Sequence, residues 1–291
     1  MSEYSILEWN INQATNHSGN NNIPNYVFEE IRASNADIVT LLEFSYSCKN
    51  AQDFIKRMEE MGYQVKYTDN KKETNQNDVL IAWKDDKFRL EDSSKNVFGP
   101  YPKENIPEML AVKLVATEGN IPIVIIGVRI KLFLFHNSKE ESWKKRKEQL
   151  TKMLEYIKDF YTEENTIIVG DFNNNRVDLD KCNDDSFVDL WSITVIDNLI
   201  KNYGLRRYTP DNMASIKQQN SIFKNDHLII SNTIKVLSKK YSRGFTNKNS
   251  DIYLHGQDFE VYNRRLKQTT WSIPYGSGIP DHAILQCRFE L

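Results

Sequence analysis

Carboxylate and amide side chains stand at the ends of several apolar runs in this sequence. In "TIIVGDFNNN" the run ends at Gly170, and Asp171 and Asn173 follow two residues apart, so they share one side of an extended segment. A carboxylate here can hold Mg²⁺ or orient its water, and the amide of Asn173 can bond a phosphoryl oxygen without adding negative charge. The pattern favours a metal or phosphate site, although an ordinary Gly-Asp turn after a strand would give the same letters.

Two earlier apolar runs end in side chains of the same kind. "ILEWNINQ" presents Asn10 and Asn12 on one face, and "DIVTLLEF" ends with Glu43. An acid at the end of a strongly apolar strand is costly to desolvate unless it has a partner such as a cation. The alternative is a glutamate that simply emerges into solvent.

Two Asp-His pairs precede late apolar runs. "KNDHLIIS" places Asp226 and His227 at the start of one predicted strand, and "GIPDHAILQCRF" places Asp281 and His282 at the start of the last. A pairing of histidine and aspartate across strands would fix the imidazole tautomer and raise its basicity, as phosphoester hydrolysis can use.

The elements that must position these residues alternate along the chain. Eight apolar runs are predicted to be strands, and helical patterns over 24–35, 51–62 and 138–165 lie between them. Interleaved helices and strands favour sheets covered by helices in an α/β architecture. No repeat or long linker divides the sequence, so a single domain over 1–291 is expected, with surface loops at 15–25, 68–78 and 242–279 flanking the site.

Composition narrows the functional classes. The formal net charge is −2, so a polyanion would have to meet a local basic surface or metal ions. Basic clusters such as "KKRK" at 144–147 are interpreted as solvated helix faces. The three cysteines predict neither a disulfide framework nor a zinc site, no signal peptide or membrane span is expected, and a cytoplasmic location fits best.

In their order, "WNIN", "LLEF", "GDFN", "NDHLIIS" and "PDHAIL" resemble the successive signatures of the endonuclease/exonuclease/phosphatase superfamily, which includes deoxyribonuclease-like and apurinic endonuclease-like enzymes. They span Ile6 to Leu285. The resemblance implies a four-layer α/β sandwich: two mixed β-sheets packed face to face, flanked by helices, with the active site where strand ends meet. Mg²⁺ is the implied cofactor, and Mn²⁺ is an expected substitute.

The resemblance also implies roles for individual residues. Glu43 is the implied main metal ligand. Asn10, with Asn12 a weaker candidate, would support the metal or the phosphate, and Asp281 would support the metal or the histidine. Asp171 would orient or deprotonate the attacking water, and Asn173 would donate to the phosphate. Asp226 would pair with His282, the implied general base or phosphate contact.

One position departs from the pattern. Many family members carry a catalytic histidine or tyrosine after the strand that corresponds to "IVIIGVRI", where this sequence has Arg129. Arginine could clamp the scissile phosphate through its forked donors, and an ordinary salt bridge at a strand end is the alternative. His136 is a second candidate for this place, ranked below Arg129.

Three functions are therefore compared. The first is a Mg²⁺-dependent nuclease that cleaves DNA or RNA phosphodiesters by in-line attack of water. The second is a phosphatase or phosphodiesterase on a small molecule or lipid headgroup. The extended basic signature of some relatives is not found, and the only hint of their membrane-facing hairpin is Trp271, Ile273, Pro274 and Tyr275, which strand or core packing explains as well. The third is a degenerate binding module, which Arg129 favours and the otherwise complete acidic set opposes.

Overall fold

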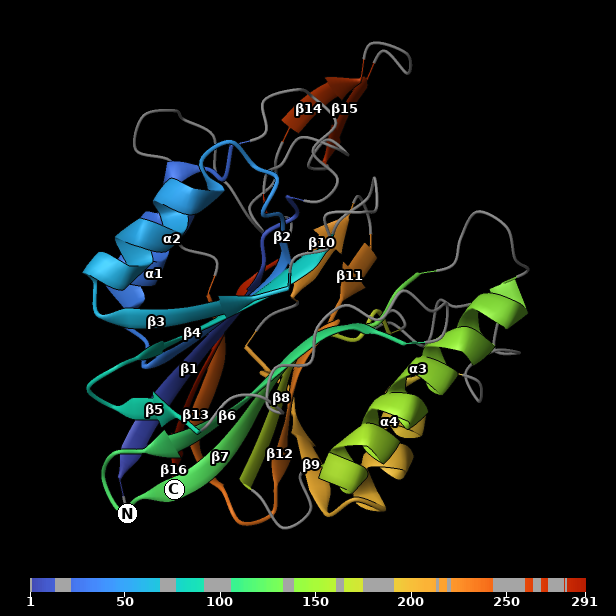
Figure 1. The fold of residues 1–291 in the computed structure, drawn as a ribbon. Helices are drawn as coiled ribbons and strands as arrows, with labels where there is room; N and C mark the ends of the chain where they lie inside the picture. Colours follow the sequence, from blue (N-terminus) through green and yellow to red (C-terminus); the bar gives the residue numbers. More distant parts are fainter. Residues whose placement is uncertain are drawn as a thin grey trace.

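In the computed structural model, two six-stranded β-sheets face each other and helices cover both outer faces (Figure 1). The structure describes residues 2–13, 22–68, 77–91, 106–132, 139–160, 165–174, 191–212, 215–218, 221–242, 260–263, 268–271, 280 and 282–291. The predicted four-layer sandwich is confirmed.

The first sheet gathers the two ends of the chain. In order across the sheet its strands are β13 (Lys235–Ser242), β16 (Ile284–Glu290), β1 (Glu3–Asn10), β2 (Ile38–Phe44), β4 (Asp78–Lys84) and β3 (Tyr63–Tyr67). The central pair β1 and β2 is parallel. Their carboxyl ends, which carry the "WNIN" and "LLEF" residues, therefore lie at one edge.

The second sheet follows the middle of the chain. Its strands in order are β5 (Phe88–Leu90), β6 (Glu108–Ala116), β7 (Ile121–Arg129), β8 (Asn165–Asp171), β12 (Asp226–Ser231) and β9 (Leu205–Tyr208). Here β7 and β8 are parallel, and β12 runs antiparallel to β8. The end of β8 consequently lies beside the start of β12.

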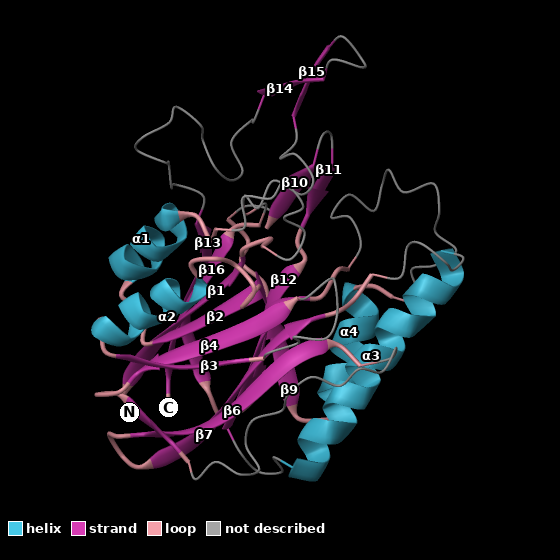
Figure 2. Cartoon of the chain, turned by 45° about the horizontal axis from the view of Figure 1, so that its top comes forward, coloured by secondary structure: helices cyan, strands magenta, loops and turns pink. Residues whose placement is uncertain are grey.

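Three apolar clusters hold the four layers together. Inward-facing residues of both sheets form the central one, for example Ile6 and Leu42 against Val112 and Ile167. The helices α1 (Asn25–Ser34) and α2 (Ala51–Glu60) pack on the first sheet, and α3 (Lys139–Phe160) and α4 (Ile193–Lys201) pack on the second (Figure 2). None of the described helices is long and apolar enough to cross a membrane.

Two short hairpins project from the end of the sandwich opposite the chain termini (Figures 1 and 2). They are β10 (Ile216–Gln218) with β11 (Ser221–Phe223), and β14 (Glu260–Asn263) with β15 (Gln268–Trp271). The expectation of surface loop over 242–279 is therefore wrong for β14 and β15, and most of the rest of this range lies outside the described residues. The expected helix over 138–165 is too long as well, because Asn165 is the first residue of β8.

Candidate active site

Strand pairing brings the predicted site residues to one edge of the sandwich. In the second sheet, Asp171 pairs with Arg129 on one side and with Asp226 on the other. From the first sheet, Asn10 donates from Nδ2 to Glu43 Oε1 at 3.2 Å and to Asp171 Oδ2 at 3.4 Å. The two sheets thus meet at a shared cluster of carboxylates and amides, as the sequence predicted.

The backbone is strained where these side chains are presented. Asn12, Glu43 and Asn173 have φ values of 52°, 49° and 46°, a left-handed conformation that costs non-glycine residues of the order of 1–3 kcal/mol each. Only glycine fits at position 170, because a Cβ there would lie 1.9 Å from the carbonyl oxygen of Val128. Strain of this kind collects at functional sites when surrounding structure imposes it.

The site contains a histidine and aspartate pair that the sequence predicted. Nδ1 of His282 lies 2.8 Å from Asp226 Oδ2 and 3.1 Å from Oδ1, and both residues are buried. The His282 carbonyl accepts from Trp9 Nε1 at 3.0 Å, which anchors the backbone of the histidine. Because Nδ1 faces the carboxylate, Nε2 is the ring nitrogen directed elsewhere, as a base or phosphate contact requires.

Asp171 is poised for proton transfer. Burial, with the nearby Asp226 charge, raises its pKa to about 7, although His282 and Arg129 oppose the shift. Its Oδ1 accepts from the Asn173 backbone N–H at 2.8 Å, and its Oδ2 from the Asn173 side-chain Nδ2 at 3.1 Å. A base with a pKa near 7 exchanges its proton readily at neutral pH.

Asn173 is engaged differently from the expectation. Its Nδ2 also donates to the carbonyl of Ile130 at 2.7 Å, so both amide protons are committed to Ile130 and Asp171. In this state Asn173 orients Asp171 and ties it to the end of β7. Donation to a phosphate would require it to release one of these bonds.

Arg129 forms the salt bridges of the alternative interpretation, and two of its partners, Glu43 and Asp171, are residues of the predicted site; the phosphate clamp stays a prediction. Its Nε lies 2.7 Å from Glu43 Oε1 and 3.9 Å from Asp171 Oδ2, and its Nη1 donates to Glu108 Oε2 at 3.0 Å. Burial opposes the charged form, but Glu43, Glu108 and Asp171 together raise the pKa of Arg129 above its ordinary value. The guanidinium is a permanent cation among three carboxylates.

The oxygen-rich donor set fits a hard divalent cation. Ligand atoms of Asp171, Asp226 and His282 lie within 4.8 Å of one another. This group differs from the set that the resemblance implied, because Glu43 is paired with Arg129 and Asp281 lies outside the described residues. Glu43 directs Oε1 to Asn10 and Arg129, whereas both oxygens of Asp226 face His282.

Sequence reasoning missed two residues of α3 that hold the strand ends from outside. Arg146 donates from Nη1 to the Asn173 carbonyl at 2.7 Å, and Gln149 exchanges hydrogen bonds of 2.9 and 3.2 Å with the backbone of Lys131. Arg146 is 7% exposed, so the interpretation of "KKRK" as a wholly solvated face is wrong for this residue. Burial lowers its pKa to about 10.

Ser215 was also missed, and it joins the two strands that carry the His-Asp pair. Its Oγ accepts from the backbone N–H groups of Asn225 at 2.8 Å and Asp226 at 3.3 Å. Its carbonyl accepts from Ala283 N at 2.6 Å. Tyr241 adds a hydrogen bond from its hydroxyl to the Asp226 carbonyl.

Glu8 is a further residue that sequence reasoning missed. It lies two residues before Asn10 and on the same face of β1, it is fully buried, and neither carboxyl oxygen has a hydrogen-bond partner among the described residues. Burial, reinforced by Asp226 and Asp171, raises its pKa well above the ordinary value. The alternation Ile6, Glu8, Asn10 could have revealed this inward position.

The remaining histidines have no place in the described site. His227 is buried with Nδ1 2.7 Å from Thr209 Oγ1 and Nε2 2.7 Å from Asn174 Oδ1, so both of its ring nitrogens have hydrogen-bond partners. His136 lies outside the described residues, as does Asp281.

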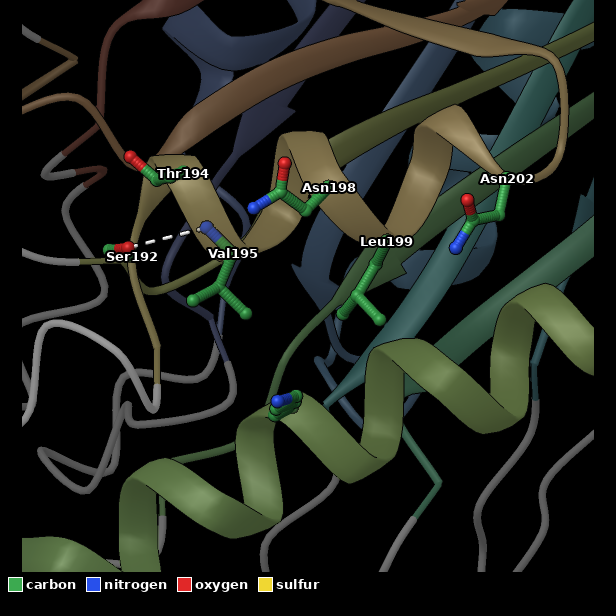
Figure 3. A pocket seen from close by; sticks show the side chains of 7 residues that line it. Ser192, Thr194, Val195, Asn198, Leu199 and Asn202 are labelled. Carbon is green, nitrogen blue, oxygen red and sulfur yellow. Dashed lines mark hydrogen bonds between the residues drawn. The ribbon is translucent and has the colours of Figure 1, made fainter.

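A separate pocket of about 400 Å³ opens between α3 and α4 (Figure 3). Lys147 of α3 and residues of α4 such as Val195 and Leu199 line it, and the Ser192 hydroxyl caps α4 at its edge. None of the residues gathered at the strand ends contributes to this pocket.

Comparison with known proteins identifies the fold. No protein-family model matches the sequence, and no curated protein does either. Among solved structures, an endonuclease/exonuclease/phosphatase family protein from Bacteroides thetaiotaomicron aligns over 99% of this chain and 98% of its own length, with a TM-score of 0.62 and 13% identity.

Two further structures have similar scores. D. rerio TDP2, solved in complex with a single-strand DNA product, covers 100% of both chains with a TM-score of 0.62 and 12% identity. A mannosyl-6-phosphatase from Bacteroides thetaiotaomicron covers 99% of this chain and 100% of its own, with a TM-score of 0.61 and 13% identity. The chain therefore has the fold of the superfamily that its motifs resemble.

Proposed function

We propose that this chain, which has the endonuclease/exonuclease/phosphatase fold, is a Mg²⁺-dependent phosphodiester hydrolase that cleaves DNA or RNA. The observation that carries the proposal is the joint placement of Asp171, Asp226 and His282 beside Glu43 and Asn10. One ligand atom from each of the first three residues lies within 4.8 Å of the others. Solved structures of this fold include phosphoesterases, which supports a hydrolase.

The proposed roles follow from the contacts, except that of Asp281, which the family resemblance implies and which lies outside the described residues. Glu43, supported by Asn10 and Asp281, would hold Mg²⁺, or Mn²⁺ in its place. When bound, the ion would neutralise phosphoryl oxygens and stabilise the leaving oxygen. Arg129 supplies a second positive charge at the same carboxylate.

Proton transfer would use the other half of the site. Asp171, held through both oxygens by Asn173, accepts the proton of the attacking water or orients that water, since its pKa of about 7 suits the task. His282, fixed by Asp226, presents Nε2 to the phosphate or shares the role of base. The attack proceeds in line with the leaving oxygen.

A phosphatase acting on a small phosphoester is the second candidate. Its support is the similarity to a solved mannosyl-6-phosphatase, which matches this chain as well as the DNA-bound protein does. The formal net charge of −2 also gives no general attraction for a long polyanion.

A substrate panel tests the proposal. Supercoiled plasmid, single-stranded DNA, RNA, abasic duplex, bis-p-nitrophenyl phosphate and a sugar monophosphate would each be incubated with Mg²⁺, Mn²⁺ or EDTA. Metal-dependent cleavage of a polymer is the expected result. Turnover of small esters alone would favour the second candidate, and nucleic-acid binding without turnover in any metal would support a degenerate module.

A further inference from the structure

The guanidinium of Arg129 lies where carboxylates from three strands converge. Three carboxylates surround its guanidinium, at 2.7 Å for Glu43, 3.0 Å for Glu108 and 3.9 Å for Asp171. Its side chain is only 14% exposed, so water screens these charges weakly. The geometry matches what a divalent ion would seek, namely several oxygens converging on one positive charge.

The guanidinium is anchored from behind. Glu108 pairs with Arg129 in the register of β6 and β7, and its other oxygen accepts from Asn77 Nδ2 at 3.2 Å. The carboxylate that holds Nη1 is therefore itself held. If Arg129 moved away from Glu43, it would also have to break its ion pair with Glu108, which the pairing of β6 and β7 keeps in place.

We propose that Arg129 is a tethered counter-cation for Glu43 that neutralises the site without metal and sets a weak affinity for divalent ions. This inference rests on the proposed function, because it assumes that Glu43 is a metal ligand. An ion at Glu43 must share or displace the contact with Arg129, and like charges within a few ångströms repel. Arg129 thus sets the concentration of divalent ion at which the site fills, whether or not Arg129 also contacts the substrate.

Calorimetric titration of the full chain with MnCl₂ tests this idea. Arg129→Gln is expected to bind Mn²⁺ roughly 10- to 100-fold more tightly than the wild type, because one repelling charge is removed. Arg129→Lys, which keeps the charge, should stay within a few-fold of the wild type. Arg89→Gln is the matched control: Arg89 is exposed on β5 and pairs with Val115, roughly 23 Å along β6 from Glu108.

A second readout needs no activity. Without metal, Arg129→Gln should melt at a lower temperature than the wild type, since three carboxylates lose their counter-ion, and Mn²⁺ should raise its melting temperature more than that of the wild type. Should the glutamine variant fail to fold, a Mg²⁺ titration of the ¹⁵N-labelled wild type followed at arginine Nε signals replaces it. One Nε resonance is expected to move on saturation.

The inference is overturned if Arg129→Gln binds Mn²⁺ no better than the wild type, or if no arginine Nε signal moves while Mg²⁺ binds. Its failure differs from that of the proposed function. If the Arg129→Gln variant has unchanged metal affinity and the enzyme hydrolyses phosphodiesters, only the counter-cation role of Arg129 is excluded. The predicted change in affinity without hydrolysis of any ester would remove only the enzymatic proposal.

Discussion

Replacement of Asp171 by asparagine should make the protein inactive and, at neutral and alkaline pH, more stable. The folded state raises the pKa of this carboxyl from 3.8 to about 7, so it holds the proton more tightly than the unfolded chain does. The carboxylate therefore destabilises the fold progressively as pH rises from about 4 to about 7, and by a constant amount above that. This rise in the pKa of Asp171 corresponds to roughly 4 kcal/mol of lost stability.

The pH dependence separates this effect from the cost of the substitution itself. The new amide would face the donor Nδ2 of Asn173, now 3.1 Å from Asp171 Oδ2, which costs roughly 1–3 kcal/mol at every pH. The charge penalty in the wild type is already about 2 kcal/mol at pH 5 and reaches about 4 kcal/mol at pH 8. The stability of the variant relative to the wild type should thus increase by roughly 2–3 kcal/mol between these pH values.

Urea unfolding in EDTA at pH 5 and pH 8 measures the difference. Asp86→Asn is the control, because that carboxyl is exposed in the turn between β4 and β5. A relative stability of Asp171→Asn that is the same at both pH values, or lower at pH 8, would refute the account of a buried, destabilised base.

Three further changes have defined outcomes. His282→Ala should lower Mg²⁺-dependent hydrolysis by roughly 10²–10⁴-fold while the circular dichroism spectrum stays native; wild-type turnover would remove His282 from the mechanism. Arg146→Gln should lower kcat about 10-fold with little change in KM, because the hydrogen bond to the Asn173 carbonyl positions the strand end, and Arg146→Lys should recover part of it. A rise in KM alone would contradict that role. Glu8→Gln should raise the free energy of unfolding by roughly 1–3 kcal/mol at pH 8 and by less at pH 4, since a carboxyl with a raised pKa destabilises the fold only as pH rises above its unfolded value. If urea unfolding shows that the variant is destabilised equally at both pH values, the charge of Glu8 does not limit stability.

The strand-end residues were predictable because two simple rules apply to them. Buried strands read as apolar runs, and a polar residue that directly follows a run, such as Glu43 or Asp171, must lie at a sheet edge. The contact between Asp226 and His282 was implied by the family resemblance, and the structure places the two side chains together. The order of the motifs then supplied the fold.

The missed elements lack such a signal. The strand β13 reads "KVLSKKYS" and has no apolar run, because an edge strand exposes lysines that discourage pairing with other chains. Arg146 lies among three lysines on α3, and only tertiary packing decides which cation of such a run turns inward. Ser215 acts through backbone groups of distant strands, which a local pattern does not encode.

The most direct test of the central claim is turnover of bis-p-nitrophenyl phosphate by the wild type and by Glu43→Gln, each with Mg²⁺ and with EDTA. The account predicts hydrolysis by the wild type that EDTA abolishes, and a loss of at least about 100-fold in the variant. Hydrolysis that persists in EDTA, or wild-type rates from Glu43→Gln in Mg²⁺, would contradict a metal-dependent phosphoesterase centred on these strand ends.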